Sequence, residues 1–510
     1  MWTPLVALAA LSAAPLFVSA TTTESAEPGF PLLSKVAIEA SSSSRLDQLL
    51  AGGLDLTAFD AQGRIEGLLR PAEIAWAREL GFRLEVVVED VYADFYRRHG
   101  AIAGNNLSDY SDYQQNVDEL AALEAAHPTI ASTDVIGVSI EGRGIYALKI
   151  SDNVATSEPE PEVLLMAIHH AREPVSNETV LELARRLLGG YGSDPEMTFL
   201  VDHREIWIIP IVNPDGYVYV DDSDPMWRKN RRGGYGVDIN RNYGFQWGYD
   251  NWGSSPYTWD ETYRGAFAWS EPETQAIHNF VHGHDIKYAL SFHTYGDLYL
   301  YPWGYYYGTS PDNSHFRDIA QVMSADNNYT YGPTSSTLYL VNGECTDWLY
   351  GEQGTKEKIF GYTVEIGDWF WPSRGEIPGL VEENMEPTFY FIEQAGGLHD
   401  GDVPLELMNT PSTIQRGSRA EWDAHVRNVA GEDLSVDSWV HVTSTSLPVE
   451  GVTKVLAEGR LVPSGYDDTV LVGGLMPLSA PIGSYTFTQR IGDRATGEIY
   501  GEDVFTAVVQ

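Results

Sequence analysis

Three apolar runs, far apart in the chain, each lead to side chains that can bind a metal ion. Residues 163–168 precede His170 and Glu173, residues 288–292 precede His293, and residues 361–364 precede Glu365. Short apolar runs are typical of buried strands, and α/β folds place their chemistry in the loops at strand ends. The chain is therefore expected to adopt an α/β fold that gathers these side chains.

Two imidazoles and one carboxylate suit zinc, because catalytic zinc sites use three protein ligands and keep a fourth position for water. The expected ligands are His170, Glu173 and His293. Glu365 is then free to act as a general base toward that water. A structural role for Glu365 is the alternative, but a carboxylate among Tyr, Thr, Val and Ile is costly to bury without a function.

Six motifs, in order over about residues 107–400, resemble those of the metallocarboxypeptidases related to pancreatic carboxypeptidase A. They are His-His-Ala-Arg-Glu at 169–173, Asn-Pro-Asp-Gly at 213–216, Trp-Arg-Lys at 227–229, Asp-Ile-Asn-Arg-Asn at 238–242, Ser-Phe-His-Thr-Tyr at 291–295 and Tyr-Thr-Val-Glu at 362–365. The resemblance implies a zinc exopeptidase that cleaves the C-terminal bond of peptides. It also implies a three-layer fold, with a mixed eight-stranded sheet and helices on both faces.

The resemblance assigns roles to further residues. Arg228 would stabilise the carbonyl oxygen, and losing such a donor typically costs ~3 to 4 kcal/mol. Asn240 and Arg241 would hold the substrate's C-terminal carboxylate, which a guanidinium can bind through two parallel hydrogen bonds. The other matches are Tyr339 as a mobile capping tyrosine, Arg172 and Tyr295 on the substrate side, and Asp238 as the carboxylate that orients His170. A solvated basic loop is the alternative for the run around Arg228.

The side-chain pocket is the least readable part of the site. The family position that separates apolar from basic preference falls at Thr346, which is neither bulky and apolar nor acidic. Glu344 lies in the same loop and can attract Lys or Arg. We therefore expect a broad preference, in which apolar C-terminal residues are accepted and basic ones are tolerated.

A chain of 510 residues is too long for one typical domain, since ~150 residues per domain suggests about three. We expect a signal peptide at 1–20, a small α+β pro-segment at 21–106, the catalytic domain at 107–400 and a β-sandwich accessory domain at 401–510. The apolar run near the start is too short to span a bilayer and ends at a small-residue cleavage site. A membrane anchor is the alternative; the expected location is extracellular or periplasmic.

The region before residue 107 resembles in position and size the family's inhibitory pro-segment. Patterns predict a helix over 72–80, a strand over 83–89 and a helix over 91–98. Arg97 and Arg98 near its end suggest a cleavage site for an activating protease. Acidic residues in this region, such as Glu85, Glu89 and Asp90, are expected to face the arginines of the cleft. An ordinary accessory domain is the alternative.

Two helix starts and several strands are also predicted from the local pattern. Ser111 with Gln114, and Ser270 with Glu273, have the spacing of capping boxes. After residue 401, short alternating segments separated by turn residues predict the β-sandwich. Its strands are expected at 419–427, 438–445, 453–461 and 484–491.

The amino-acid composition argues against some classes of binding partner. Against 32 Lys and Arg stand 73 Asp and Glu, so the net charge of −41 argues against nucleic acid and anionic membranes. The only cysteine, Cys345, excludes an internal disulfide. The expected partners are peptides with a free C-terminus, and no membrane segment remains after signal removal. A calcium site is possible but cannot be read from the sequence.

Two other functions use the same features. A secreted zinc amidase acting on cell-wall peptides would have the same metal ligands, so the terminal-carboxylate clamp of Asn240 and Arg241 discriminates against it. A non-catalytic binding protein would be expected to have lost Glu365 or a ligand. Both features are intact, which favours a secreted carboxypeptidase made as a precursor.

Overall fold

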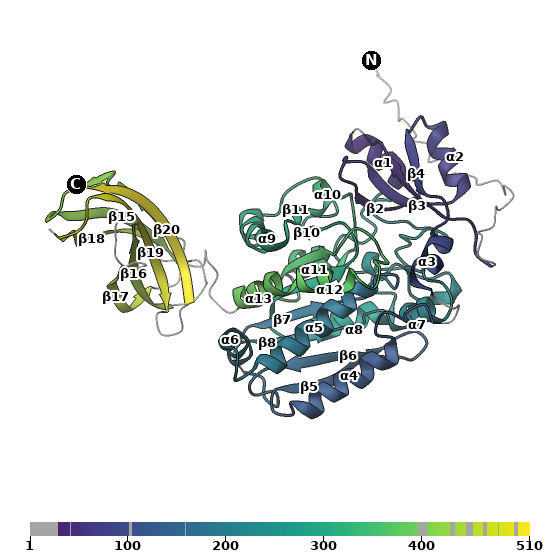
Figure 1. Cartoon of the computed structure of the whole chain (residues 1–510), viewed down its shortest axis with the longest axis horizontal. Helices are drawn as coiled ribbons and strands as arrows, with labels where there is room; N and C mark the ends of the chain where they lie inside the picture. The colour runs from purple at the N-terminus through teal and green to yellow at the C-terminus, as the bar shows by residue number, and fades with distance from the viewer. Residues whose placement is uncertain are drawn as a thin grey trace, which may run out of the picture. The chain divides into compact units, whose positions relative to one another are not determined.

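The computed structural model describes residues 29–40, 42–100, 105–158, 160–395, 405–428, 434–444, 452–462, 467–477, 479–493 and 498–510. The chain divides into two compact units, Met1–Ile392 and Glu393–Gln510 (Figure 1). The expected signal peptide at 1–20 and the expected boundary at 400/401 lie outside the described residues. Among the helices that are described, none combines the length and apolar character needed to cross a bilayer.

Residues 29–100 form a small α+β subdomain, which we call the N-terminal subdomain. Its antiparallel sheet has the strand order β2-β3-β1-β4, formed by β1 (Ser34–Ile38), β2 (Asp55–Phe59), β3 (Ile65–Leu69) and β4 (Leu84–Val88). Its helices are α1 (Ser43–Ala51), α2 (Pro71–Glu79) and α3 (Val91–His99). The predicted α2, β4 and α3 are confirmed within one or two residues.

A mixed eight-stranded sheet forms the centre of the larger subdomain, as expected, with the order β11-β10-β12-β9-β7-β8-β6-β5. The strands are β5 (Ala131–Val138), β6 (Gly144–Ile150), β7 (Glu162–Met166), β8 (Glu205–Ile209), β9 (Ile286–His293), β10 (Leu298–Tyr301), β11 (Thr330–Pro333) and β12 (Phe360–Glu365). Strands β12, β9, β7 and β8 are mutually parallel. Their carboxyl ends therefore meet at one edge of the sheet.

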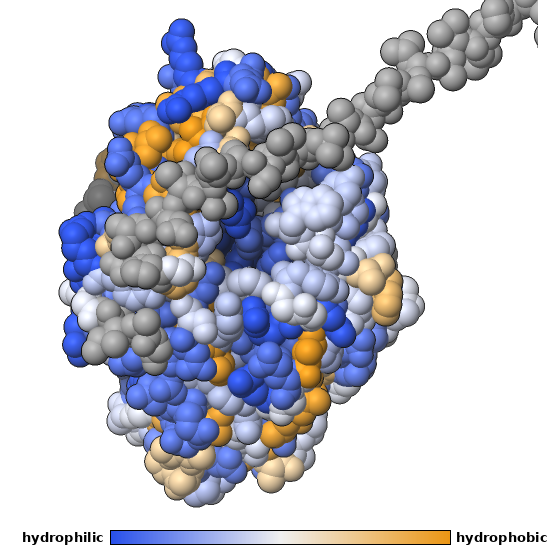
Figure 2. Space-filling model, turned by 90° about the vertical axis from the view of Figure 1, so that its right-hand side faces the viewer, coloured by the Kyte–Doolittle hydropathy of each residue, from blue (hydrophilic) through white to orange (hydrophobic). Residues whose placement is uncertain are grey.

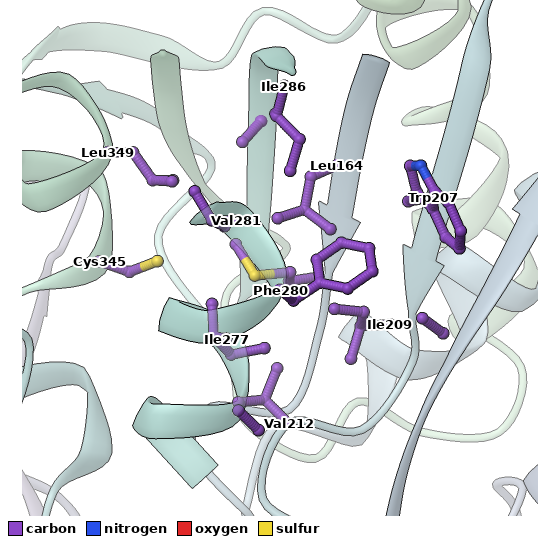
Figure 3. Packing of buried hydrophobic residues seen from close by; sticks show 14 of the residues in the cluster. Leu164, Trp207, Ile209, Val212, Ile277, Phe280, Val281, Ile286, Cys345 and Leu349 are labelled. Atoms are coloured by element: carbon purple, nitrogen blue, oxygen red, sulfur yellow. The ribbon is translucent and has the colours of Figure 1, made fainter. Parts of the chain in front are cut away.

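Both faces of the parallel strands are buried, which explains their continuous apolar sequences. Every residue of β7 is buried, and successive side chains of a strand point to opposite faces. On one face, Leu164 packs with Phe280 and Val281 of α8 (Pro272–His282) and with Leu349 of α11 (Cys345–Gly351) (Figure 3). Helices must therefore cover both faces.

The remaining helices surround this sheet (Figure 1). They are α4 (Tyr113–Ala126), α5 (Pro174–Gly190), α6 (Pro195–His203), α7 (Pro214–Asp222), α9 (Asn313–Asn327), α10 (Thr334–Thr337), α12 (Ile377–Glu382) and α13 (Met385–Gln394), with 3-10 turns η1 (Arg232–Gly234) and η2 (Ile239–Arg241).

The two predicted capping boxes are wrong in detail. Helix α4 is capped one residue later than expected, by Asp112 with Gln115, because that pair satisfies both backbone donors. Helix α8 has Glu271 at its N-cap and no side-chain cap. Glu273 instead accepts hydrogen bonds from the Ile140 amide and from Asn230, since the tertiary fold offers it buried donors.

The C-terminal unit contains two sheets, a three-stranded one ordered β13-β15-β18 and a five-stranded one ordered β14-β20-β19-β16-β17. Their strands are β13 (Leu405–Met408), β14 (Thr413–Ile414), β15 (Arg419–Arg427), β16 (Leu434–Thr443), β17 (Val452–Val462), β18 (Asp467–Leu475), β19 (Gly483–Asp493) and β20 (Glu498–Val509). Trp422 of one sheet packs against Phe505 and donates to Gln489 of the other. The two sheets therefore share a core.

Candidate metal centre and active site

The backbone brings the predicted ligands to one edge of the sheet. His293 and Glu365 end the neighbouring parallel strands β9 and β12, where they are paired in register. After β7 the chain turns through Ile168, whose φ of 52° is unusual for a β-branched residue, and reaches His170. Glu173 then lies at the N-cap of α5. Residues separated by nearly 200 positions thus meet in space.

Three buried acceptors converge at this edge. Nδ1 of His170 lies 2.9 Å from a Glu173 oxygen, Nδ1 of His293 lies 2.9 Å from the other oxygen, and the two Nδ1 atoms are 3.1 Å apart. The three ligand atoms lie within 4.8 Å of one another. Such a set suits zinc, which binds imidazole nitrogen and carboxylate oxygen.

Asp238 fixes the orientation of His170. Its Oδ1 lies 3.2 Å from Nε2 of His170, and its Oδ2 accepts hydrogen bonds of 3.1 and 2.9 Å from Arg228. Burial opposes ionisation, but Arg228, Arg241 and His170 hold the pKa of Asp238 well below its usual range. An ionised Asp238 accepts the Nε2 proton of His170, which leaves Nδ1 as a lone pair directed at the metal position.

The Glu365 carboxyl shares a cavity with His170, Glu173 and Arg228. Burial and then the charge of Glu173 raise the pKa of Glu365 well above its usual value in the protein alone, although Arg228 opposes the shift. By contrast, the pKa of Glu173 is lowered. Burial opposes this shift, but the charges of His170 and then His293 outweigh it. Two carboxyls with opposite shifts in one site are suited to different roles, one to binding a cation and one to carrying a proton.

The predicted carboxylate clamp lines the same cavity. Asn240 accepts a hydrogen bond of 3.0 Å from the Cys345 amide, and Arg241 donates to the Asn240 carbonyl at 2.8 Å. Nε of Arg241 is buried and has no hydrogen-bond partner within the part of the chain that the structure describes. The Arg241 guanidinium, which lines the cavity, therefore retains donor capacity for a ligand.

Arg172 does not face an open cleft, because it binds the N-terminal subdomain. Its two terminal nitrogens donate to the two oxygens of Asp55 at 2.7 and 2.8 Å, and both side chains are almost fully buried. Asp55 and Thr57 lie on the same face of β2, since alternate residues of a strand share a face. Our sequence reasoning did not predict this contact, because the position of β2 at the cleft depends on the order of the strands in the sheet.

Two tyrosines that were expected on the substrate side also contact the N-terminal subdomain. The Tyr295 hydroxyl is 2.7 Å from Thr57 Oγ1 and donates to Glu66 at 3.0 Å. The Tyr339 hydroxyl donates to the Leu56 carbonyl at 3.1 Å. The apolar core of the subdomain continues into the segment around Tyr339. These contacts hold the side chains expected to meet substrate.

The expected acidic contacts of the N-terminal subdomain were wrong. Glu85 is exposed and pairs with Arg64 of its own subdomain at 2.7 Å. Asp90 caps α3 by accepting from the Ala93 amide, and Glu89 contributes its backbone carbonyl to a hydrogen bond with Ser34. These residues lie on β4 and at its end, whereas β2 and β3 supply the side chains that reach the cleft, so the sheet order decides which acids face the arginines.

The cavity that remains is small, at about 30 Å³. It is lined by Leu56 and Thr57 of the N-terminal subdomain and by side chains of the larger subdomain that include Glu344, Tyr339 and Thr363. A cavity of this size holds a water molecule but no peptide. With the N-terminal subdomain in this position, the cavity has no room for a peptide.

Glu344 rather than Thr346 lines this cavity among the described residues. Glu344 is buried, and burial together with the charge of Asp347 raises its pKa well above the usual value. Thr346 is buried on α11. A raised pKa favours the neutral form of Glu344, and a neutral carboxyl costs less free energy to bury beside apolar groups than a carboxylate does.

A second acidic group lies elsewhere. Asp152, Glu158 and Glu160 bring carboxylate oxygens within 4.8 Å of one another. Burial and the neighbouring carboxylates raise the pKa of Glu160 to about 7. Acidic groups of this kind are common without a bound ion, so we assign no calcium to them.

Comparison with known proteins identifies the family. Residues 117–387 match the family model described as zinc carboxypeptidase, which is more than half of the chain. The chain belongs to the zinc carboxypeptidase family. It is 34% identical over 303 residues to a zinc carboxypeptidase of Saccharothrix mutabilis subsp. capreolus, covering 56% of this chain and 69% of that protein. It is 32% identical over 310 residues to carboxypeptidase A1 of Bos taurus, covering 56% and 72%.

Solved structures agree with the family's fold. The carboxypeptidase A from Helicoverpa armigera has a TM-score of 0.63 at 23% identity, covering 71% of this chain and 97% of that one. Bovine thrombin-activatable fibrinolysis inhibitor, in complex with tick carboxypeptidase inhibitor, has a TM-score of 0.51 at 27% identity, covering 56% and 97%. The expected carboxypeptidase fold is confirmed. The protein is a metallocarboxypeptidase, and zinc is the metal of its family.

Proposed function

We propose that this metallocarboxypeptidase releases C-terminal residues from peptides, with Glu365 as the general base. The convergence of His170, Glu173 and Glu365 in one cavity with Arg241, next to His293 of the same candidate metal site, carries the proposal. Zinc, when bound to the three ligands, lowers the pKa of its water from ~15.7 toward ~7. Glu365 accepts a proton from the attacking water and later donates it to the leaving amine.

Two cationic side chains would act on the substrate. Arg228 is held by Asp238, so its guanidinium is already oriented when charge develops on the carbonyl oxygen. Arg241, with Asn240, would bind the free C-terminal carboxylate through its remaining donors. Tyr339 and Tyr295 would border the substrate once the N-terminal subdomain has moved. That movement is needed because the Tyr339 hydroxyl now donates to the Leu56 carbonyl of the subdomain.

A peptide panel tests the activity directly. Processed protein is incubated with peptides that differ only in the C-terminal residue, with and without a chelator, and released amino acids are quantified. Loss of one residue at a time from the C-terminus, abolished by chelator and restored by Zn²⁺, is the expected result. Release of internal fragments would contradict the exopeptidase proposal.

The clamp predicts that a free C-terminal carboxylate is required. Amidating the C-terminus of a good peptide substrate should lower kcat/KM by about 10²-fold or more, because a charge-assisted pair worth ~3 kcal/mol is lost. Initial rates on the acid and the amide are compared at matched concentrations. Equal rates would favour an amidase or endopeptidase, neither of which the resemblance to carboxypeptidases favours.

For side-chain preference, we infer that apolar C-terminal residues bind well and that Lys and Arg are tolerated. The cavity wall combines apolar Leu300, Leu338 and Val341 with Glu344, a lining carboxyl that is neither a candidate metal ligand nor the proposed base. Glu344 can stay neutral beside an apolar residue, whereas a bound ammonium or guanidinium would favour its ionised form. The same peptide panel ranks these residues.

We also propose that the N-terminal subdomain is an inhibitory pro-segment and that residues 1–20 direct export from the cell. The buried pair of Arg172 with Asp55 and the contacts of Tyr295 with Thr57 and Glu66 support the inhibitory role. Arg97 and Arg98 lie near the end of α3 with their side chains largely exposed, accessible to an activating protease.

The C-terminal unit, in which we find no catalytic cluster among the described residues, would be an accessory domain.

The uncleaved chain should hydrolyse small substrates slowly, and limited proteolysis near Arg98 should raise the rate. Asp55→Ala should raise the activity of the uncleaved chain at least about tenfold, since breaking a buried ion pair costs ~3–5 kcal/mol and 1.4 kcal/mol corresponds to tenfold. Rates are measured before and after proteolysis, with cleavage followed by mass.

Glu85→Ala is the matched control, because Glu85 is an exposed acid of the same subdomain that does not reach the cleft. It should leave latency unchanged. Full activity in the uncleaved wild type, unaltered by trimming, would instead make the subdomain an accessory domain.

A further inference from the structure

Three fully buried polar residues beside the metal centre have no part in the proposed chemistry. They are His169, Ser291 and Tyr243, each at most 1% exposed. Buried polar groups are costly unless they are hydrogen-bonded. Their partners therefore indicate why the chain places them there.

The three residues form a continuous hydrogen-bonded row that begins at a metal ligand. Nε2 of His293 is 3.0 Å from Ser291 Oγ, which is 3.1 Å from Nδ1 of His169. Nε2 of His169 is 2.8 Å from the Tyr243 hydroxyl. Ser291 and His293 are on the same face of β9, and the His169 and His293 rings stack with centroids 5.5 Å apart.

A metal at His293 sets the direction of donation at the start of the row. Because Nδ1 of His293 supplies the lone pair, Nε2 carries the proton and donates to Ser291 Oγ. The Ser291 hydroxyl then donates to Nδ1 of His169, and Nε2–H of His169 donates to Tyr243. Every group in the row has the donor or acceptor that this direction requires.

His293 differs in this respect from the other histidine ligand. His170 donates to the carboxylate of Asp238, which is a strong acceptor. The first acceptor of His293 is a neutral hydroxyl, which binds an N–H more weakly. A hydroxyl that donates onward is polarised and becomes a better acceptor, by ~10–30% per bond.

We propose that Ser291, His169 and Tyr243 are positioning residues that orient His293 and set the affinity of the site for zinc. The proposal rests on the zinc site of the proposed function. It extends that site through residues that touch neither substrate nor metal. The row ends beside the substrate clamp, since the Tyr243 amide donates to the Gly343 carbonyl at 2.9 Å and Arg241 precedes Tyr243 by two residues.

Zinc affinity of the intact chain tests the proposal without any activity assay. Ser291→Ala should lower the affinity about 10–100-fold, the usual effect of losing such a supporting residue. His169→Leu should lower it by a smaller factor, and His169→Gln, which keeps an acceptor and a donor, should restore most of the loss. Affinity is measured by competition with a chromophoric chelator.

A double variant and a cobalt spectrum distinguish orientation from general loosening. If His169 acts through Ser291, the Ser291→Ala/His169→Leu variant should bind zinc no more weakly than Ser291→Ala alone. The visible absorption of the cobalt-substituted protein should shift in Ser291→Ala, because it reports ligand geometry. The control is Ser139→Ala, another buried serine, whose hydroxyl donates to Asp215 and which belongs neither to the row nor to the candidate ligands.

Wild-type zinc affinity and an unchanged cobalt spectrum in both Ser291→Ala and His169→Leu would overturn the proposal. A loss of affinity in Ser139→Ala equal to that in Ser291→Ala would also overturn it, since the cause would then be general stability. The measurement is independent of peptide hydrolysis. A carboxypeptidase assay that failed while these affinities followed the prediction would count against the proposed substrate and not against the row.

Discussion

Replacing His293 with alanine should produce a folded chain that retains no zinc and hydrolyses no peptide. The site has only three protein ligands, so removing one leaves an imidazole and a carboxylate that cannot hold the ion tightly. Zinc content per chain after dialysis and peptide hydrolysis should both fall to background. This is the largest effect expected of any single substitution described above.

His284→Ala is the matched control for that experiment. His284 also bonds to a glutamate, Glu162 at 2.7 Å, but Glu162 begins β7 and so lies at the edge of the sheet opposite the ligands. Its zinc content and activity should stay near the wild-type values. A full complement of zinc in His293→Ala would contradict the ligand assignment.

Glu365→Gln should keep zinc and lose catalysis. The amide has nearly the same shape as the carboxyl but cannot accept a proton from water, and general acid–base catalysis typically contributes ~10²–10⁴-fold. We therefore expect kcat/KM to fall by a factor in that range while the zinc content per chain is unchanged. The two measurements together separate the base from the ligands.

Asp368→Asn serves as the control for Glu365→Gln. Asp368 lies three residues beyond Glu365, is exposed and does not line the cavity among the described residues. The Asp368→Asn variant also replaces a carboxyl group with an amide close to Glu365 in sequence. It should leave kcat/KM close to that of the wild type. Near-normal activity in Glu365→Gln would place the base elsewhere.

The face shown in Figure 2 is largely hydrophilic, with apolar residues scattered among polar ones. A surface of this kind fits the net charge of −41. Two arginines of the site are neutralised by buried carboxylates within this acidic chain. Arg172 is paired with Asp55, and Arg228 is paired with Asp238. Releasing Asp55 would leave Arg172 free for an anionic group of the substrate.

Local sequence was enough to find the candidate ligands and the strands that carry them. A buried parallel strand must be continuously apolar, so a His or Glu directly after such a run is visible without any structure, as at His293 and Glu365. Helices α2 and α3 of the N-terminal subdomain were likewise predicted, because Pro71 and Gly100 mark a helix start and a helix end, whereas α1 was not predicted.

The helix caps, and the contacts between the N-terminal subdomain and the larger subdomain, were decided by tertiary structure. Ser270 and Glu273 have the spacing of a capping box, yet Glu273 binds Asn230, which only the fold brings near. The expected cleft-facing acids, Glu85 and Asp90, satisfy local partners, as their neighbours in sequence allow.

The sequence by itself pointed to the family, to the candidate metal ligands and to Glu365 as the proposed base, because each prediction depends on residue type at the end of a locally recognisable strand. Only the tertiary structure decided that Asp55, rather than Glu85, reaches Arg172, because strand order in a sheet is set by long-range pairing that no local pattern encodes. The same holds for the row from His293 to Tyr243: its members are close in space because β7, β9 and the segment after η2 end at one edge.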